Sequence, residues 1–256
     1  MSTLEPSKAR YKQVAAILRE AIRRGDYRPG TTLPSQPDLA RQYGLNQSSI
    51  SRAVAMLQAE GWVRTEHGKG SVVLDMPTVK RVRRMGTDYR SSEGRSSYAE
   101  ELAEVGLAPR TELVRWGIEP ASNEIAGILE MDPESQGQVL VRRRHMFADE
   151  KPVQLATSYV PLDVAGSADL AMPDTGPSGI YARLAERGFG PVRFTEDIEV
   201  RSATAEEADF LEVAGGQPVF SILRTAFDAD GRRVEVCVNI LAALRWRLTY
   251  AWEQGA

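Results

Sequence analysis

The sequence predicts an α+β protein in two parts: helices that end in a short β-hairpin, followed by helices that alternate with an antiparallel sheet. Apolar residues recur at helical spacing in the first third of the chain, and from Val139 onward β-branched runs flank two turns. The charge divides in the same way. Residues 1–95 carry 17 Lys and Arg against 9 Asp and Glu, a net charge of +8, whereas residues 96–256 carry 15 against 26, a net charge of −11.

Three helices are predicted in the N-terminal part. Apolar residues three or four positions apart over residues 11–22 predict the first helix, and Gly25 ends it. Ser35 stands three residues before Asp38, as in a capping box, and begins a second, short helix. Gly44 can take the left-handed conformation that closes this helix.

A third helix and a hairpin follow. Asn46 is a suitable N-cap for a helix that extends to about Glu60. Because roughly three residues that include a glycine separate the second and third helices, the pair has the spacing of a helix-turn-helix. Residues 63–66 and 71–74 predict two strands around the basic, glycine-rich turn His67–Gly70. This order of elements predicts a winged helix-turn-helix domain.

The third helix has two chemically different sides. Its apolar stripe contrasts with an opposite side that carries short, uncharged polar groups and one arginine, where a surface helix would normally carry Glu and Lys. The first turns of the second helix of a helix-turn-helix lie in the major groove, where such groups match the donors and acceptors of base edges. The candidate base readers are Gln47, Ser48, Ser51 and Arg52. An ordinary amphipathic helix is the alternative.

The N-terminal part resembles the winged-helix domain of the GntR family of bacterial transcription regulators over about residues 7–75, through the runs PSKARYKQV, YRPGTTLPS, LARQYGLNQSSISRAVAMLQAEGWV and HGKGSVV. The chain departs from the family where Gln36 and Pro37 replace a frequent Glu-Arg pair, and where Gln47 and Ser51 replace common arginines. Fewer guanine contacts through Arg are therefore expected. The residues expected at DNA, the wing included, are Ser35, Gln36, Asn46, Gln47, Ser48, Ser49, Ser51, Arg52, His67, Gly68 and Lys69.

The predicted boundaries are a DNA-binding domain over residues 1–75, a linker over residues 76–95 and a second domain over residues 96–256. The linker has no periodic apolar pattern and contains basic residues together with Ser and Gly. These basic residues either touch DNA phosphates or belong to a solvated tether, and both interpretations stay open.

In the second domain two stretches look alike, each a helix followed by a hairpin. The first comprises residues 122–129, 139–147 and 153–160, and the second comprises residues 204–211, 219–228 and 234–241. A further helix over residues 178–187 and a strand over residues 192–201 lie between them. We expect the two hairpins to pair in one antiparallel sheet; chance similarity of two hairpins is the alternative.

This layout resembles the UTRA ligand-sensing domain of the HutC subfamily over residues 97–245. The resemblance implies a fold related to chorismate lyase, dimerisation through this domain, and an R-x-R pair, here Arg142 and Arg144, that contacts anionic groups of an effector. It also implies that polar groups on the second strand of each hairpin and the start of an intervening helix line the site. The matching residues are Gln154, Glu235, Ser178 and Tyr181.

The two arginines can also be interpreted without the resemblance. On a strand, Leu140, Arg142, Arg144 and Met146 share one face. Arginines between apolar neighbours on a covered sheet face need an anionic partner. That partner is either a ligand or a carboxylate of the protein itself, and the sequence leaves both open.

Composition argues against several kinds of site. Cys237 is the single cysteine, so we expect no disulfide framework and a reducing, cytoplasmic location. With His67 and His145 as the only histidines, no Cys/His metal site and no cofactor are expected. No signal peptide, membrane-length apolar run or nucleophile–base set is recognised, which argues against a membrane partner and an enzyme. The basic N-terminal third could meet nucleic acid or an anionic membrane, and its folded pattern favours nucleic acid.

The sequence therefore predicts a sequence-specific DNA-binding transcription regulator, a repressor whose operator binding is modulated by a small, anionic effector. A single winged helix makes few base contacts, so a homodimer on an inverted-repeat operator is expected. Two alternatives remain. One is a ligand-independent repressor of a plasmid or mobile element, and the other is a DNA-binding domain fused to a chorismate-lyase-like enzyme.

Overall fold

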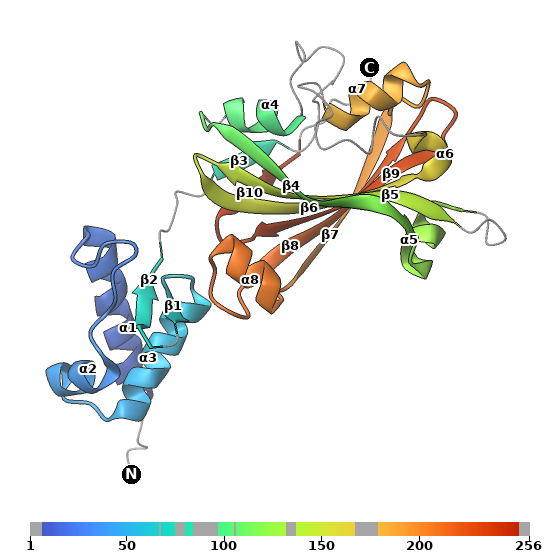
Figure 1. Cartoon of the computed structure of the whole chain (residues 1–256). Helices are drawn as coiled ribbons and strands as arrows, with labels where there is room; N and C mark the ends of the chain where they lie inside the picture. The colour runs from blue at the N-terminus through green and yellow to red at the C-terminus, as the bar shows by residue number, and fades with distance from the viewer. Residues whose placement is uncertain are drawn as a thin grey trace, which may run out of the picture. The chain divides into compact units, whose positions relative to one another are not determined.

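The computed structural model describes residues 7–66, 68–74, 80–83, 97–104, 106–131, 137–166 and 179–250. The chain divides into two compact units, the first formed by Met1–Thr78 with Ser202–Pro218 and the second by Val79–Arg201 with Val219–Ala256. Figure 1 traces the elements along the chain. No helix in the described ranges is long and apolar enough to cross a membrane.

The N-terminal elements follow the predicted order of three helices and a hairpin. They are α1 (Ser7–Arg24), α2 (Gln36–Tyr43), α3 (Gln47–Ala59), β1 (Val63–Glu66) and β2 (Gly70–Val73). The two strands pair antiparallel, with Val63 opposite Val73. A single apolar cluster, which includes the fully buried Leu18, Leu39 and Leu57, holds the three helices and the hairpin together. The predicted winged helix-turn-helix fold is confirmed.

Caps fix where α2 and α3 begin and end. The Ser35 hydroxyl accepts a hydrogen bond from the Asp38 backbone amide at 3.3 Å, and Gly44 closes α2 with a left-handed φ of 62°. The Asn46 side-chain oxygen accepts from the Ser49 amide at 2.9 Å and so begins α3. The turn between the two helices is therefore set by local chemistry, as the sequence predicts.

The second domain is built on a six-stranded antiparallel sheet in the order β4-β5-β6-β9-β8-β7. Both predicted hairpins are present in it, and they meet where β6 pairs antiparallel with β9. The strands are β4 (Pro109–Pro120), β5 (Gln138–Ala148), β6 (Lys151–Pro161), β7 (Arg193–Ser202), β8 (Pro218–Phe227) and β9 (Arg233–Ala242). The strand order is symmetric about the β6–β9 pair, which agrees with two related helix–hairpin units.

The helices predicted before each hairpin are also present. Ser122 caps α5 (Asn123–Ile128), and Thr204 caps α8 (Ala205–Leu211) in a complete capping box with Glu207. The intervening helix α7 spans Gly179–Glu186, and its predicted first residue, Ser178, lies outside the described residues.

Helices cover both faces of the sheet (Figure 1). On one face, α7 and the short α6 (Leu162–Ala165) pack through Leu184 and Val164 against Leu140 of β5. On the other face, α5 packs through Ile125 against Val141 of β5. A strand buried on both sides explains why β5 and β6 appear in the sequence as nearly continuous apolar runs.

Several elements were not predicted. The outer strand β4 carries a bulge at Val114 that breaks its alternation, so its period-2 pattern is hidden in the sequence. The others are α4 (Ser97–Glu104), α6, β3 (Lys80–Arg83) and β10 (Trp246–Thr249). Strand β3 lies inside the predicted linker, where it pairs parallel with β10. Because backbone pairing needs no apolar pattern, the composition of β3 did not indicate a strand.

Candidate DNA interface and ligand-binding face

The two sides of α3 separate as the sequence predicts. Ile50, Val54 and Leu57 are buried in the core of the winged helix, with exposures of at most 2%. Gln47, Ser48, Ser51 and Arg52 are exposed on the opposite side. The helix therefore offers a surface of hydrogen-bonding groups that its own packing does not use.

Gln47 and Arg52 are the two groups on this surface that remain free to bind. Neither side chain makes a hydrogen bond or ion pair with the described part of the chain. The Gln47 amide can donate and accept at once, as a bidentate contact to adenine requires, and Arg52 can donate twice to guanine.

Four of the other predicted residues serve the helix starts. The Asn46 side-chain oxygen accepts from the Ser49 amide and from the Ser48 hydroxyl, at 2.9 and 3.0 Å. The Ser35 hydroxyl donates to the Asp38 carboxylate at 2.6 Å. Asn46, Ser48 and Ser35 therefore have part of their hydrogen-bonding capacity committed within the protein, and Ser49 is half-buried.

Two glycines shape the wing tip. Gly68 and Gly70 have φ angles of 78° and 94°, a region that favours glycine, and open space surrounds Gly68. The Lys69 ammonium lies 2.9 Å from the Glu66 carboxylate. Hydrogen bonds from Lys69 and Arg64 lower the pKa of Glu66 below its ordinary value. Lys69 is 72% exposed, so it can exchange this partner for a phosphate; His67 lies outside the described residues.

A row of side chains, three of them polar, crosses one face of the large sheet. The strand register places Trp116, Arg142, Ser158, Cys237 and Arg224 side by side on β4, β5, β6, β9 and β8. Arg142 is 4% exposed. Arg144 lies two residues further along β5 on the same face, as the alternation of the strand predicts.

Arg144 has only neutral partners. Its Nη2 donates to the Ser158 hydroxyl at 2.5 Å and lies 3.6 Å from the Cys237 sulfur. Its Nε atom is buried and has no hydrogen-bond partner in the described part of the chain, and no described carboxylate pairs with it. A buried guanidinium nitrogen without an acceptor leaves room for an additional acceptor group.

The equivalent arginine of the second hairpin is different. Arg224 Nε donates to the Glu196 carboxylate at 2.7 Å, and the Tyr250 hydroxyl donates to the same carboxylate at 2.6 Å. The Arg224 and Glu196 side chains are only 15% and 9% exposed. The charge of Arg224 is therefore neutralised by a carboxylate of the protein itself. Sequence analysis did not identify Glu196 as this partner.

Three of the remaining predicted ligand residues have internal partners, and Ser178 lies outside the described residues. The Tyr181 hydroxyl donates to the Glu235 carboxylate at 2.7 Å, and Glu235 is 1% exposed. Burial and then the Glu235 charge raise the pKa of Tyr181, which keeps its phenol protonated as the donor. The Gln154 amide donates to the Asn239 side-chain oxygen at 2.8 Å. These pairs line the same face as the arginines.

Ser158 and Asn239 were missed by sequence reasoning. Ser158 lies four residues after Gln154 on β6, and Asn239 lies four residues after Glu235 on β9. Period-2 alternation from the two predicted residues places both on the same face, so the signal was present.

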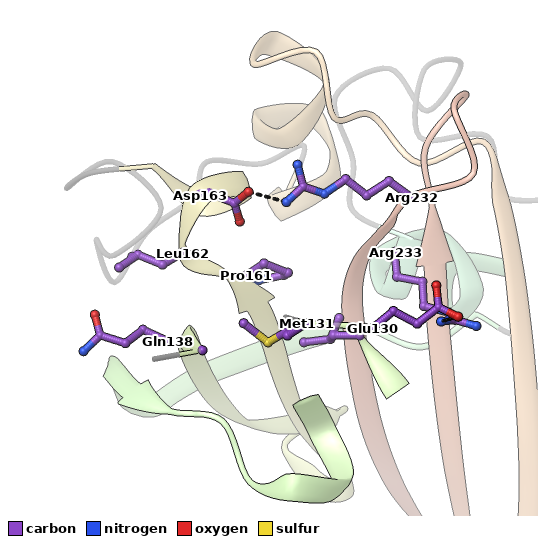
Figure 2. A pocket seen from close by; sticks show the side chains of 10 residues that line it. Glu130, Met131, Gln138, Pro161, Leu162, Asp163, Arg232 and Arg233 are labelled. Atoms are coloured by element: carbon purple, nitrogen blue, oxygen red, sulfur yellow. Dashed lines mark hydrogen bonds and ion pairs between the residues drawn. The ribbon is translucent and has the colours of Figure 1, made fainter. Parts of the chain in front are cut away.

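A cavity of about 730 Å³ lies at one end of the sheet (Figure 2). Two arginines on its wall already have acidic partners: Arg232 pairs with Asp163, and Arg233 pairs with Glu130. None of the predicted effector residues lines it. Its lining residues are Leu129, Glu130, Met131, Gly137, Gln138, Pro161, Leu162, Asp163, Arg232 and Arg233.

The described residues contain no group of three His, Cys, Asp or Glu side chains that could hold a metal ion. Cys237 is buried, and burial raises the pKa of its thiol. It therefore stays protonated and acts as a small apolar neighbour of Arg144.

Comparisons with known families cover both domains. The model described as bacterial regulatory proteins, gntR family, matches residues 10–73, and the UTRA domain model matches residues 104–247.

Individual proteins match along nearly the whole chain. The HTH-type transcriptional repressor NagR of Bacillus subtilis (strain 168) is 25% identical over 241 residues, which is 94% of this chain and 93% of that protein. The HTH-type transcriptional regulator RB1450 of Rhizobium meliloti (strain 1021) is 30% identical over 242 residues, again 94% and 93%. A crystal structure of a GntR-family transcriptional regulator superposes with a TM-score of 0.63 and 29% identity, covering 98% of this chain and 99% of that one.

The capping role of Asn46 leads to a prediction. Asn46→Ala removes the acceptor for the Ser49 amide, so the free energy of unfolding should fall by about 1 kcal/mol. Asn46→Ser keeps a capping oxygen and should stay within a few tenths of a kcal/mol of the parent. Urea unfolding followed by circular dichroism measures both. Equal stability of all three proteins would contradict a capping role.

Proposed function

The chain belongs to the GntR family of bacterial regulatory proteins and carries a UTRA domain, and from this we propose that it is a repressor that binds an inverted-repeat operator as a homodimer and is released by a small anionic effector. Membership in the family gives DNA binding and ligand sensing. The repressor role, the homodimer and the effector chemistry are the proposed parts. NagR and the fructoselysine utilization operon repressor of Escherichia coli (strain K12), which is 25% identical, are relatives named as repressors.

The exposed side of α3 supports sequence-specific binding. Gln47 and Arg52 reach outward with no partner among the described residues, while their helix is held by a buried apolar stripe. A rigid helix with free donors and acceptors on its first turns is what base reading in a major groove requires.

The contrast between Arg144 and Arg224 supports an anionic effector. The two arginines occupy equivalent positions, yet Arg224 pairs with a carboxylate, whereas the buried Nε of Arg144 has no acceptor among the described residues. Arg142 lies on the same face and is 4% exposed. An anionic group of the effector would complete the hydrogen bonds of Arg144 and contribute more than a neutral hydrogen bond does. Glu235 on the same face would accept from a hydroxyl or ammonium group of the ligand.

The outer strand β7 supports the homodimer. Its apolar residues alternate with charged ones, and three of them, Phe194, Ile198 and Val200, are 38%, 43% and 59% exposed. This side is partly covered, since Phe194 contacts the Tyr181 ring, and a second copy of the chain would cover the exposed part around Ile198 and Val200. Two copies would also present two winged helices to an inverted repeat.

The first prediction tests operator recognition. The full-length protein should select an inverted repeat from a pool of randomised duplexes. Gln47→Ala should lose about 1–3 kcal/mol on that duplex and relax one base position per half-site. Lys69→Ala should weaken binding to all sequences alike and lower the salt slope by about 1, because it removes a phosphate contact. Selection of no sequence by the parent protein would contradict the proposed function.

The second prediction tests the effector site. Arg144→Ala should keep operator affinity but lose the response to the effector, with binding weakened about tenfold or more. The effector would first be identified by thermal shift against a panel of small phosphates and carboxylates. Arg224→Ala is the matched control. It leaves Glu196 without its cation and should cost roughly 3–5 kcal/mol of stability. A similar loss of stability in Arg144→Ala, or a normal effector response, would argue for a structural role of Arg144.

The third prediction tests assembly. Replacing Ile198 and Val200 together by Glu should shift the protein toward monomer, since two charges on the apolar side of β7 oppose its burial. Glu199→Gln, on the other side of the same strand, should leave the dimer intact. Sedimentation velocity measures both. A parent protein that is a monomer, or a double variant that dimerises normally, would count against the β7 interface.

A further inference from the structure

One side-chain hydrogen bond joins the two helices of the helix-turn-helix. The Ser51 hydroxyl on α3 donates to the Gln36 side-chain oxygen at the start of α2, at 2.6 Å. Both helices are described in full, and no other side-chain hydrogen bond connects them. Gln36 is half-buried and Ser51 is exposed on the side of α3 that faces away from the core.

This bond limits what Ser51 can offer to DNA. A serine hydroxyl has one donor and two acceptor lone pairs, and here the donor is used by Gln36. What remains for a base edge is an acceptor. In the major groove the base donors are the exocyclic amino groups, N6 of adenine and N4 of cytosine. Ser51 held in this way therefore prefers adenine or cytosine over thymine.

The bond also orients Gln36. Its oxygen is occupied by Ser51, while its two amide N–H donors have no partner in the described chain. Gln36 is the first residue of α2, next to the N-cap Ser35. In a helix-turn-helix the first helix crosses the DNA backbone, and the amide end of a helix favours anions. The Gln36 N–H groups are therefore placed to donate to a phosphate oxygen.

We propose that Gln36 is a positioning residue for base recognition: it fixes the Ser51 hydroxyl as an acceptor for one exocyclic amino group, and it ties that contact to the DNA backbone. The proposal rests on the DNA-binding function proposed above and adds a residue pair that acts as one unit. It distinguishes Ser51 from Gln47 and Arg52, which have no partner in the described chain.

The bond matters more in the complex than in the free protein. In the free protein, water competes for both partners, so the bond adds little to folding. At the DNA, water is excluded, and an amide or hydroxyl left without its partner weakens binding. Loss of the pair should therefore appear in operator affinity and base preference, and not in thermal unfolding.

The test is a double-mutant cycle on full-length protein, with the duplex that the parent protein selects from a randomised pool. Gln36→Ala and Ser51→Ala should each weaken binding about five- to tenfold, and the double variant should bind no more weakly than the weaker single variant. Both single variants should lose preference at the same adenine or cytosine. Ser51→Thr keeps the hydroxyl and should restore affinity and preference.

Gln42→Ala is the matched control: it is an exposed glutamine at the far end of α2, without a bond to α3, and its replacement should change neither affinity nor preference. Single effects that multiply in the double variant would overturn the coupling. An unchanged base preference in Gln36→Ala, with thermal unfolding normal, would reduce Gln36 to a phosphate contact and also overturn it. If the parent protein selects no sequence, the proposed function fails together with this inference; if it selects one and the cycle shows no coupling, only the inference fails.

Discussion

The antiparallel pairing of β6 with β9 is the interaction on which the second domain depends. It joins the two hairpins into one sheet and places Ser158 beside Cys237. Because strand faces alternate with a period of two, a slip of one residue between β6 and β9 would turn Glu235 and Cys237 to the face opposite Ser158 and the two arginines of β5. The buried side chains on both sides of these strands make such a slip expensive, so the register is fixed by the core.

The two hairpins of this sheet share one backbone geometry, but their side chains have different partners. Arg144 and Arg224 stand at matching positions, but among the described residues only Arg224 pairs with a carboxylate. Tyr181 and Glu235 likewise form a closed pair, as do Gln154 and Asn239. Among the described residues, the buried atom of this face that has no hydrogen-bond partner is Arg144 Nε, on the first hairpin. That asymmetry is the basis of the proposed effector site at Arg144.

How much the sequence predicts depends on whether local or distant residues decide an element. Ser35, Gly44 and Asn46 act on neighbours in the chain, and the helix-turn-helix was predicted correctly from them. The two hairpins were predicted because buried strands carry a strong apolar signal. Strand β4 was not predicted because a bulge interrupts its alternation of side chains. Strand β3 was not predicted because its backbone pairing with β10 requires no particular composition. The sequence also did not show which partner each buried arginine has, because whether Arg144 meets a carboxylate depends on strands that are distant in sequence.

The parallel pairing of β3 with β10 anchors part of the segment that the sequence analysis assigned to the linker. Lys80 lies opposite Trp246, and only Ala243–Arg245 separate β10 from β9. Trp246 is buried, which holds β10 to the body of the second domain. The chain that leads toward the DNA-binding helices is thus fastened beside the end of the strand that carries Glu235, Cys237 and Asn239. A displacement of that strand would therefore reach β3, which lies inside the predicted linker, through the ordered backbone of β10.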